Sequence, residues 1–517
     1  MDNNLLTDPI LRVDTTSGSR KRLSLPGVMA DLMQGEIISF AALQAHQNHA
    51  WHAFLVQLAA MALHRADQAT PPVEEKKWRE MLRHLTLDWS WDEPWRLVVE
   101  DLGKPAFMQP PVPENSLKGF KNQYAQPDQI DVLVTAKNHD IKMARIDHPQ
   151  PDNWIMALVS LQTMEGFMGA GNYGIARMNG GFASRPGVGI RPDPLWGSHF
   201  RQDLTVLRQD RDALLERYPD FYQKKDGAAL LWLLPWDGLT SLSLADLDPY
   251  FIEICRRVRF SSGPKGPLAH ISTSKATRIL AKDFKGVLGD PWTPIRTDKE
   301  ETSLTVTGKG FDYDLAARLL LGDGGYRFSP AQIQGIHVQQ GQGEFYARAL
   351  ARGQGVSEGY HERRIPIPTR VKAILSQPDK RASLAALATQ RVDQSGIMAN
   401  KVLKPALLTM IQEAPDKLNF KDRRADPWLM DLDHQVDDEF FPSLWRTLEN
   451  SREEAEIDWL SFLRKTSQAI MASANNALIG GGARRYKTIT AAERTFYGAL
   501  FKNFAVLRKN EGQTNAE

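Results

Sequence analysis

The pattern of apolar and polar positions divides the first 366 residues into helices, short strand-like runs and glycine-rich loops. Strand-like runs occur at Ile10–Val13 and Leu304–Thr307. The stretch 168–194 is so rich in glycine and proline that it indicates a loop system. A second stretch, rich in glycine and glutamine, spans Gln339–Ser357. Apolar residues at helical spacing predict helices over 26–34, 39–65, 74–86, 152–166 and 202–217.

After Pro366-Ile367-Pro368 the pattern becomes helical to the end of the chain. Leu384, Leu387, Ala388 and Val392 recur at helical spacing, as do Phe496, Leu500, Phe504 and Leu507. Thr490 and Glu493 have the spacing of a capping box, which predicts a helix start there. Four or five helices in this length are typical of an antiparallel bundle. We therefore predict an α+β protein with a large mixed α/β domain over 1–366 and a C-terminal antiparallel four-helix bundle over 367–517.

Composition indicates a folded, water-soluble chain. Of 517 residues, 42% are hydrophobic and 24% are charged, which excludes wholesale disorder. The 64 Lys and Arg nearly balance the 62 Asp and Glu, so any nucleic-acid surface is expected to be local. The N-terminus lacks the pattern of a signal peptide, and the most apolar helix, around Trp51–Leu63, is too short and polar to span a bilayer. We expect a cytoplasmic protein with no membrane association.

The single cysteine limits the redox and metal chemistry of the chain. One thiol, Cys255, excludes an intrachain disulfide and any site with several cysteine ligands. Its neighbours Ile252 and Ile254 favour a buried small hydrophobe over a nucleophile. We expect neither a metal nor any other cofactor.

Other enzyme-like patterns are weak. His46, His49 and His52 share a predicted helix face, but without a nearby carboxylate they favour structural roles. The acidic run Asp431–Glu439 could hold a divalent cation, but its position near a predicted helix start favours a solvated helix cap. Gly480–Arg485 lacks the lysine and spacing of a phosphate-binding loop. No catalytic set is assembled, which favours a binding protein over an enzyme.

Several basic segments border glycine-rich loops, as a nucleic-acid binder would require. Arg177-Met178-Asn179-Gly180-Gly181-Phe182 combines a cation, an amide and two glycines. Glycine allows a backbone to approach a ligand closely, which matters in a narrow minor groove. Each basic segment could also be a solvated face, yet several beside glycine loops favour phosphate contact. They are Lys137–Lys142, Lys275–Lys285, Arg348–Arg364 and Arg484–Lys487.

The order of short motifs resembles the CasA family, the large subunit of the type I-E CRISPR surveillance complex Cascade. The similarity runs along essentially the whole chain, and it is the collinear order of weak motifs that carries it. The motifs are Leu5–Val13 as the opening strand, the helical Phe54–Leu58, Pro105-Ala106-Phe107-Met108-Gln109, Asn179–Phe182 as the glycine loop, Lys282–Phe284 through Trp292–Pro294, and His361-Glu362-Arg363-Arg364.

This resemblance implies a non-enzymatic subunit that recognises the protospacer-adjacent motif in double-stranded target DNA through the minor groove. In the family, a glycine loop and a lysine read the motif, and a wedge then separates the first base pairs so that guide RNA can invade. When the family's motifs are matched to this sequence, the residues expected to bind the DNA motif are Asn179, Gly180, Gly181 and either Lys282 or Lys285. The strand wedge falls on Gln354, Gly355, Val356 and Ser357. A loop toward the guide and partner subunits falls on Lys137, Asn138, His139 and Lys142.

The resemblance also implies the partners. These are the crRNA, the other Cascade subunits (backbone, small, crRNA-capping and crRNA-processing) and a recruited helicase-nuclease. Some relatives carry a cysteine-rich zinc knuckle after the position of Cys255, but Ser261–Lys265 follows here, so we expect no zinc. On the bundle, the candidates for contact with the displaced strand are Arg423, Arg424, Arg484, Arg485 and Lys487.

Three alternatives remain open at this point. The chain could be the large subunit of another CRISPR type or of a transposon-linked variant. It could be a metal-dependent hydrolase that uses Asp431–Glu439, or a purely structural assembly protein. A purely structural protein would show no preference for a DNA motif, and substitution of Asn179 or Gln354 would cause no loss of function.

Overall fold

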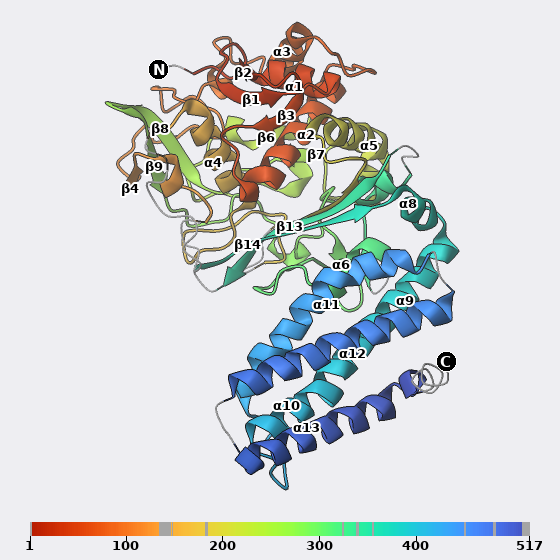
Figure 1. Ribbon diagram of the computed structural model, residues 1–517. Helices are drawn as coiled ribbons and strands as arrows, with labels where there is room; N and C mark the ends of the chain where they lie inside the picture. Colours follow the sequence, from red (N-terminus) through yellow and green to blue (C-terminus); the bar gives the residue numbers. More distant parts are fainter. Residues whose placement is uncertain are drawn as a thin grey trace. The chain divides into compact units, whose positions relative to one another are not determined.

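The computed structural model describes residues 3–133, 146, 148–180, 185–322, 325–337, 341–353, 356–448, 451–478 and 482–508. The chain divides into two compact units (Figure 1). The first comprises Met1–Phe311 and Gly324–Ser376, and the second comprises Asp312–Asp323 and Gln377–Glu517. The fold is mixed, as predicted, with the strands in the first unit and a helical bundle in the second.

Helix α2 (Asn48–Arg65) lies in the core of the first unit. Its residues from His49 to Leu63 are all buried, because a helix that is apolar almost all round is stable only inside a core. Helices α4 and α5 and strand β7 pack against it. The bounds of the other helices in this unit are α1 (Leu25–Gln34), α3 (Glu75–His84), α4 (Pro151–Met164), α5 (Trp196–Arg217), α7 (Pro330–Ile333) and α8 (Thr369–Leu375).

Small sheets complete the first unit. The longest strands, β13 (Gly343–Gly353) and β14 (Val356–Ile367), form an antiparallel hairpin, and β5 (Gly187–Arg191) pairs with the other edge of β13. Strands β6 (Ala228–Leu230) and β7 (Leu247–Ile252) pair in parallel. The remaining sheets have the orders β2-β1-β3 (Arg20–Leu23, Leu11–Thr15, Ile37–Phe40), β4-β9-β8 (Asn122–Tyr124, Gly266–Ser272, Arg257–Gly263) and β11-β10-β12 (Thr302–Ser303, Ile295–Arg296, Tyr326–Arg327).

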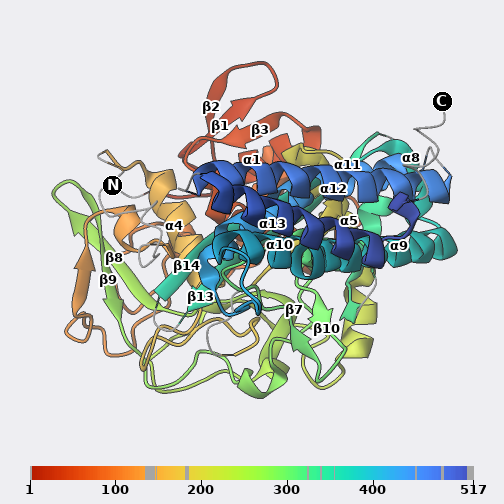
Figure 2. The same ribbon diagram turned by 60° about the horizontal axis from the view of Figure 1, so that its bottom comes forward.

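Four long helical segments, counted over the described residues, make up the bundle of the second unit. They lie alongside one another in both views (Figures 1 and 2). Phe440 is in the bundle core, with its ring 5.9 Å from that of Trp459. The segments are α9 (Pro378–Ile397) continuing through a π-helical turn (Met398–Leu403) into α10 (Lys404–Ile411), then α11 (Asp426–Arg446), α12 (Arg452–Ala477) and α13 (Gly482–Asn503).

A short helix from the middle of the chain joins this bundle. Helix α6 (Tyr313–Leu321) packs on α9 and α11, and the ring of Tyr313 lies 5.0 Å from that of Phe440. Residues 312–323 therefore belong to the second unit. The predicted boundary near residue 366 assigned them to the first domain instead. The functional roles assigned to 1–366 and 367–517 stay predictions.

Three local predictions were wrong. The helix expected over 39–65 begins only at Asn48, because Phe40 ends a strand whose partner is Val13. Thr490 does not start the last helix, since α13 begins at Gly482 and the Thr490 hydroxyl donates to the carbonyl of Tyr486. The strand expected at Leu304–Thr307 is confined to the preceding pair, Thr302–Ser303.

Candidate DNA-recognition site

The described part of the glycine loop (Asn179–Phe182), which is Asn179 and Gly180, is half-buried, with open space beside Gly180. Gly180 has a φ of +50°, and a Cβ there would meet no other atom within 4 Å. Asn179 is half-buried, and its side-chain amide lies 3.4 Å from the hydroxyl of Thr305. Gly181 lies outside the described residues. Gly180 thus offers free backbone surface in a left-handed conformation that favours glycine.

The two candidate lysines flank one short turn but differ in their surroundings. Lys282 begins a single 3-10 turn (Lys282–Phe284) and is exposed. Lys285 follows in the left-handed conformation, with a φ of +50°, and forms an ion pair with Glu300. The charge of Lys285 is therefore already engaged by an acid, which leaves Lys282 as the better candidate for a contact with DNA.

A cavity of about 330 Å³ brings Lys282 and the glycine loop together. Gly180 and Lys282 both line it, although they are far apart in the sequence. Gly286 explains the close approach, because a Cβ at that position would lie 2.8 Å from the carbonyl carbon of Met178. The other lining residues are mostly apolar: Phe167, Tyr173, Gly174, Ile175, Ala176, Met178, Thr277, Ile279 and Ala281.

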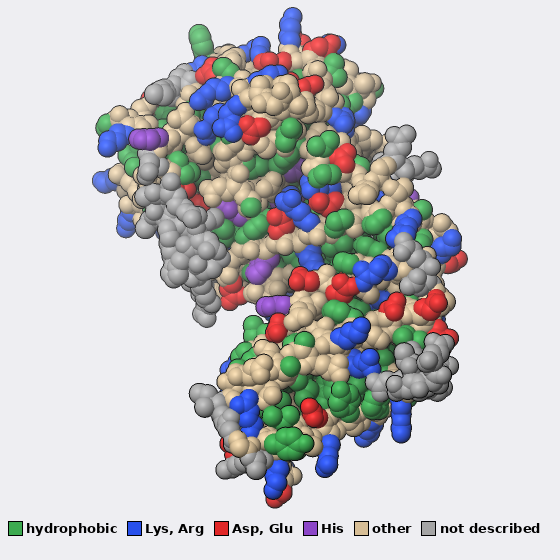
Figure 3. Space-filling model, in the orientation of Figure 1, with side chains coloured by type: hydrophobic (Ala, Val, Ile, Leu, Met, Phe, Trp, Pro, Cys, Tyr) green, Lys and Arg blue, Asp and Glu red, His purple; other side chains and the backbone are tan. Residues whose placement is uncertain are grey.

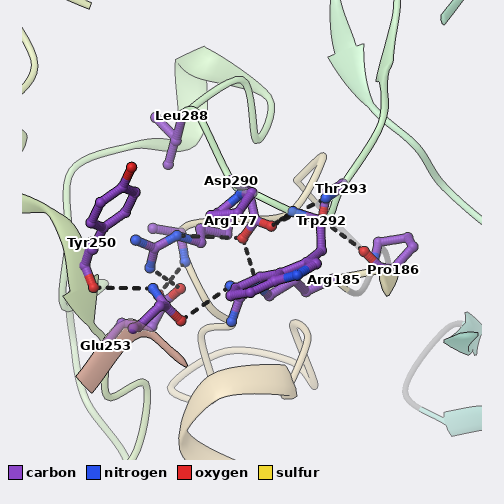
Figure 4. Close-up of polar contacts among 12 residues, drawn as sticks. Arg177, Arg185, Pro186, Tyr250, Glu253, Leu288, Asp290, Trp292 and Thr293 are labelled. Atoms are coloured by element: carbon purple, nitrogen blue, oxygen red, sulfur yellow. Dashed lines mark hydrogen bonds and ion pairs between the residues drawn. The ribbon is translucent and has the colours of Figure 1, made fainter. Parts of the chain in front are cut away.

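A buried ionic network includes the two arginines that flank the loop in the sequence (Figure 4). Arg177, two residues before Asn179, is 3.4 Å from Glu253 and 3.5 Å from Asp290. Arg185, on the far side of the loop, is 2.5 Å from the same oxygen of Asp290. Burial raises the pKa of Glu253 and lowers that of Arg185. Sequence reasoning missed Glu253 and Asp290, because acids so far along the chain leave no local pattern.

The predicted wedge lies at the tip of the β13–β14 hairpin. Gly353 pairs with Val356, and Gln354 and Gly355 come between them in the sequence. Those two residues, and the side chain of Val356, lie outside the described residues. Ser357 is fully buried, and its hydroxyl donates to the carbonyl of Val132 over 3.1 Å. Ser357 is therefore an incorrect choice for a residue that enters the duplex.

The other predicted contact residues are described only in part. Lys137, Asn138, His139 and Lys142 lie outside the described residues, as does the side chain of Arg484.

The basic side chains predicted on the bundle differ in whether they already contact other groups of the protein. Arg423 and Arg424 form ion pairs with Asp426 at 3.0 Å and Asp422 at 2.6 Å. The guanidinium of Arg485 donates to the backbone of Asn475, whereas Lys487 is exposed. Pairing with neighbouring acids weakens the case for Arg423 and Arg424 as contacts for the displaced strand.

The histidines on and beside α2 are buried and engaged with carboxylates or rings. His46 is 2.8 Å from Asp131, and His49 packs edge-on against Trp292. His52 and His199 both approach one oxygen of Asp203, at 2.8 and 3.2 Å.

Among the described residues, His52, His199 and Asp203 are a group that could hold a metal ion. The two imidazoles, however, are stacked, with centroids 3.8 Å apart and planes 13° apart. Each imidazole nitrogen directs its lone pair within its own ring plane, so two nearly parallel rings cannot both point at one ion. The geometry fits a buried carboxylate with three donors around one oxygen, since the indole nitrogen of Trp292 also donates to that oxygen of Asp203, over 2.7 Å.

The acidic run Asp431–Glu439 lies within helix α11 rather than at its start. Asp431 accepts a hydrogen bond from Gln435, and Glu439 pairs with Arg446. Burial raises the pKa of Asp433. Asp431 and Glu439 thus have partners on their own helix, which does not favour the hydrolase alternative. Over the described residues, no helix is long and apolar enough to cross a membrane.

Comparison with known proteins identifies relatives of this chain. Residues 4–196 match the family model of CRISPR-associated protein Cse1. A comparison with curated protein sequences finds no match. Among solved structures, Thermobifida fusca Cse1 is 14% identical, with a TM-score of 0.65 over 97% of this chain and 98% of that one.

Two further structures share the fold. CasA (Cse1) of Thermus thermophilus is 15% identical, with a TM-score of 0.63 over 97% of this chain and 99% of that one. A chain from the structure of a CRISPR RNA-guided surveillance complex is 11% identical, with a TM-score of 0.58 over 96% and 99%. Residues 4–196 are thus similar in sequence to the Cse1 family, and almost the whole chain shares the fold of the solved Cse1 (CasA) structures.

Proposed function

We propose that this chain is the large subunit of a type I-E Cascade complex and recognises a short motif in duplex target DNA. It acts by binding rather than by catalysis, and a recruited helicase-nuclease cuts the DNA. The match of residues 4–196 to the Cse1 family model supports this role, as does the fold shared with a chain of a CRISPR RNA-guided surveillance complex. The crRNA and the other Cascade subunits are its partners.

The observation that carries the proposal is the meeting of Gly180 and Lys282 at one cavity. The minor groove is narrow and presents mainly acceptors. Glycine backbone with open space beside it, as at Gly180, can enter such a groove without a steric clash, and a lysine ammonium can donate there. Asn179 adds an amide that donates and accepts. Together they form a compact reader of the minor-groove edge.

The β13–β14 hairpin provides the element that separates the strands. Gln354 and Gly355 come between its two strands in the sequence, and β13 and β14 pair over their whole length. Opening a duplex costs about 1.4 kcal/mol per base-pair step, and the RNA–DNA hybrid nearly offsets this. The hairpin therefore needs only to start the opening, after which guide RNA pairing continues it.

Binding to DNA depends on the assembled complex. The net charge of the chain is only +2, and lysines and arginines lie among aspartates and glutamates on the face shown in Figure 3. Because phosphate contacts supply most non-specific affinity, an isolated chain with so little excess charge binds DNA weakly. The backbone subunits and the guide RNA hold the target against it.

The test compares Lys282→Ala with Lys285→Ala in the reconstituted complex. Lys282→Ala is expected to reduce affinity for motif-bearing duplex, and Lys285→Ala is the matched control, since Lys285 is paired with Glu300. Fluorescence anisotropy on motif and scrambled duplexes measures both affinity and discrimination. Equal losses for the two variants, or none for Lys282→Ala, would overturn the assignment of Lys282 as the reader.

A further inference from the structure

The arginines that flank the glycine loop in the sequence both form ion pairs with one buried carboxylate, and that of Arg185 is also a hydrogen bond. Asp290 lies 3.5 Å from Arg177 and 2.5 Å from Arg185, and these two arginines flank the loop on either side. Figure 4 shows both guanidinium groups directed at Asp290. The two stems of the loop are thus held against the same point of the core.

The charges in this network balance one another. Arg177, Arg185, Glu253 and Asp290 are each no more than 2% exposed in their side chains. The guanidinium of Arg177 also lies over the ring of Phe251, 3.7 Å from its centroid. Buried charges are tolerated only when paired, so two arginines facing two acids form a closed set. Removing the charge of Asp290 leaves an excess of positive charge between the loop stems.

Asp290 is itself rigidly placed. Its second oxygen accepts from the backbone nitrogens of Trp292 and Thr293, at 2.9 and 3.1 Å. The hydroxyl of Thr293 donates to the carbonyl of Pro186, next to Arg185. Lys282 and Asp290 lie eight residues apart in one short segment, 282–290. This segment therefore carries both the lysine that would contact DNA and the carboxylate that pairs with the arginines beside the loop.

We propose that Asp290 is a positioning residue for motif reading, which sets the glycine loop and the Lys282 segment in register with each other. Asp290 is buried and does not touch DNA; it acts through Arg177 and Arg185. This inference rests on the proposed function. It predicts that loss of the carboxylate charge reduces discrimination of the motif more than it reduces general affinity for DNA.

The test is Asp290→Asn, with Asp248→Asn as the matched control. Asp248 is also buried and pairs with Arg211 at 2.6 Å, in the same unit but with α5 as its partner. Both variants lose a buried carboxylate charge, so both are expected to melt at a lower temperature. Only Asp290→Asn is expected to lower the ratio of the affinity for motif duplex to the affinity for scrambled duplex. If the variant's loop adopts its binding-competent arrangement one-tenth of the time, this ratio falls about tenfold.

Each outcome has a distinct meaning. If the wild-type complex shows no motif preference, the proposed function fails. If the wild type discriminates and Asp290→Asn does so equally well, or if Asp248→Asn loses as much, the positioning role of Asp290 is wrong. Should Asp290→Asn not fold, Arg185→Lys and its control Arg211→Lys give the same comparison. Lysine keeps the charge in both but loses the forked guanidinium geometry.

Discussion

Substitutions at Gly180 distinguish two reasons for a glycine in the recognition loop: its left-handed backbone conformation and the close approach of its backbone to the minor groove. With a φ of +50° and no atom within 4 Å of a Cβ, alanine would fit sterically but would cost about 1–2 kcal/mol of left-handed strain. Asparagine adopts this conformation more readily, so it adds a side chain with less strain. Gly18, with a φ of +77° and equally open surroundings, is the matched control in the β1–β2 turn.

Both Gly180→Ala and Gly180→Asn are expected to lose motif discrimination in the reconstituted complex. A side chain there holds the backbone away from the base edges, and one good base contact contributes about 1–3 kcal/mol of discrimination. A loss of about 1.4 kcal/mol is tenfold in the ratio of dissociation constants. The assay is fluorescence anisotropy with motif and scrambled duplexes, and circular dichroism melts of the isolated chain report the strain.

The Gly18 variants give the comparison that decides the interpretation. Gly18→Ala is expected to melt at a slightly lower temperature, as Gly180→Ala does, while keeping full discrimination. If Gly180→Asn retains wild-type discrimination and only Gly180→Ala loses it, the glycine serves backbone conformation alone. The reasoning from close approach to the groove would then be refuted.

Two further predictions concern buried titratable groups. Burial raises the pKa of the Cys255 thiol to about 12, so the folded chain should not react with a thiol reagent at pH 8 and should react fully in denaturant; rapid reaction of the native protein would contradict its burial. Burial, followed by the nearby His52, lowers the pKa of His199 to about 3. The unfolded chain therefore binds a proton below about pH 6.5 that the folded chain does not. Stability should decrease as pH falls from 6.5 toward 3, by up to about 1.4 kcal/mol per pH unit for this one group. Urea unfolding of His199→Gln should show a smaller pH slope than the wild type; an equal slope would contradict the assignment.

The sequence predicted the bundle well because helices are local. Leu384, Ala388, Phe496 and Leu500 are buried, as their helical spacing indicated. The start of α13 was misplaced because Thr490 and Glu493 have the spacing of a capping box, although the helix continues through them from Gly482. Spacing alone cannot show whether the preceding turn is already helical.

The recognition site was predicted only in part, for physical reasons that differ between residues. The glycines and lysines carry local signals, but Arg185 and Asp290 meet across 105 residues of sequence, and no local pattern records such a pair. Ser357 was chosen from a glycine-rich stretch that reads as a loop. It lies in β14 instead, and pairing with β13 turns its side chain into the core.

Selection from a randomised motif library by the reconstituted complex, with and without this chain, tests the central claim most directly. Duplexes retained by the complex are sequenced in each case. The account predicts that a short motif is enriched only when the chain is present, and that Gly180→Asp abolishes the enrichment. Equal enrichment without the chain would contradict its role as the recognition subunit.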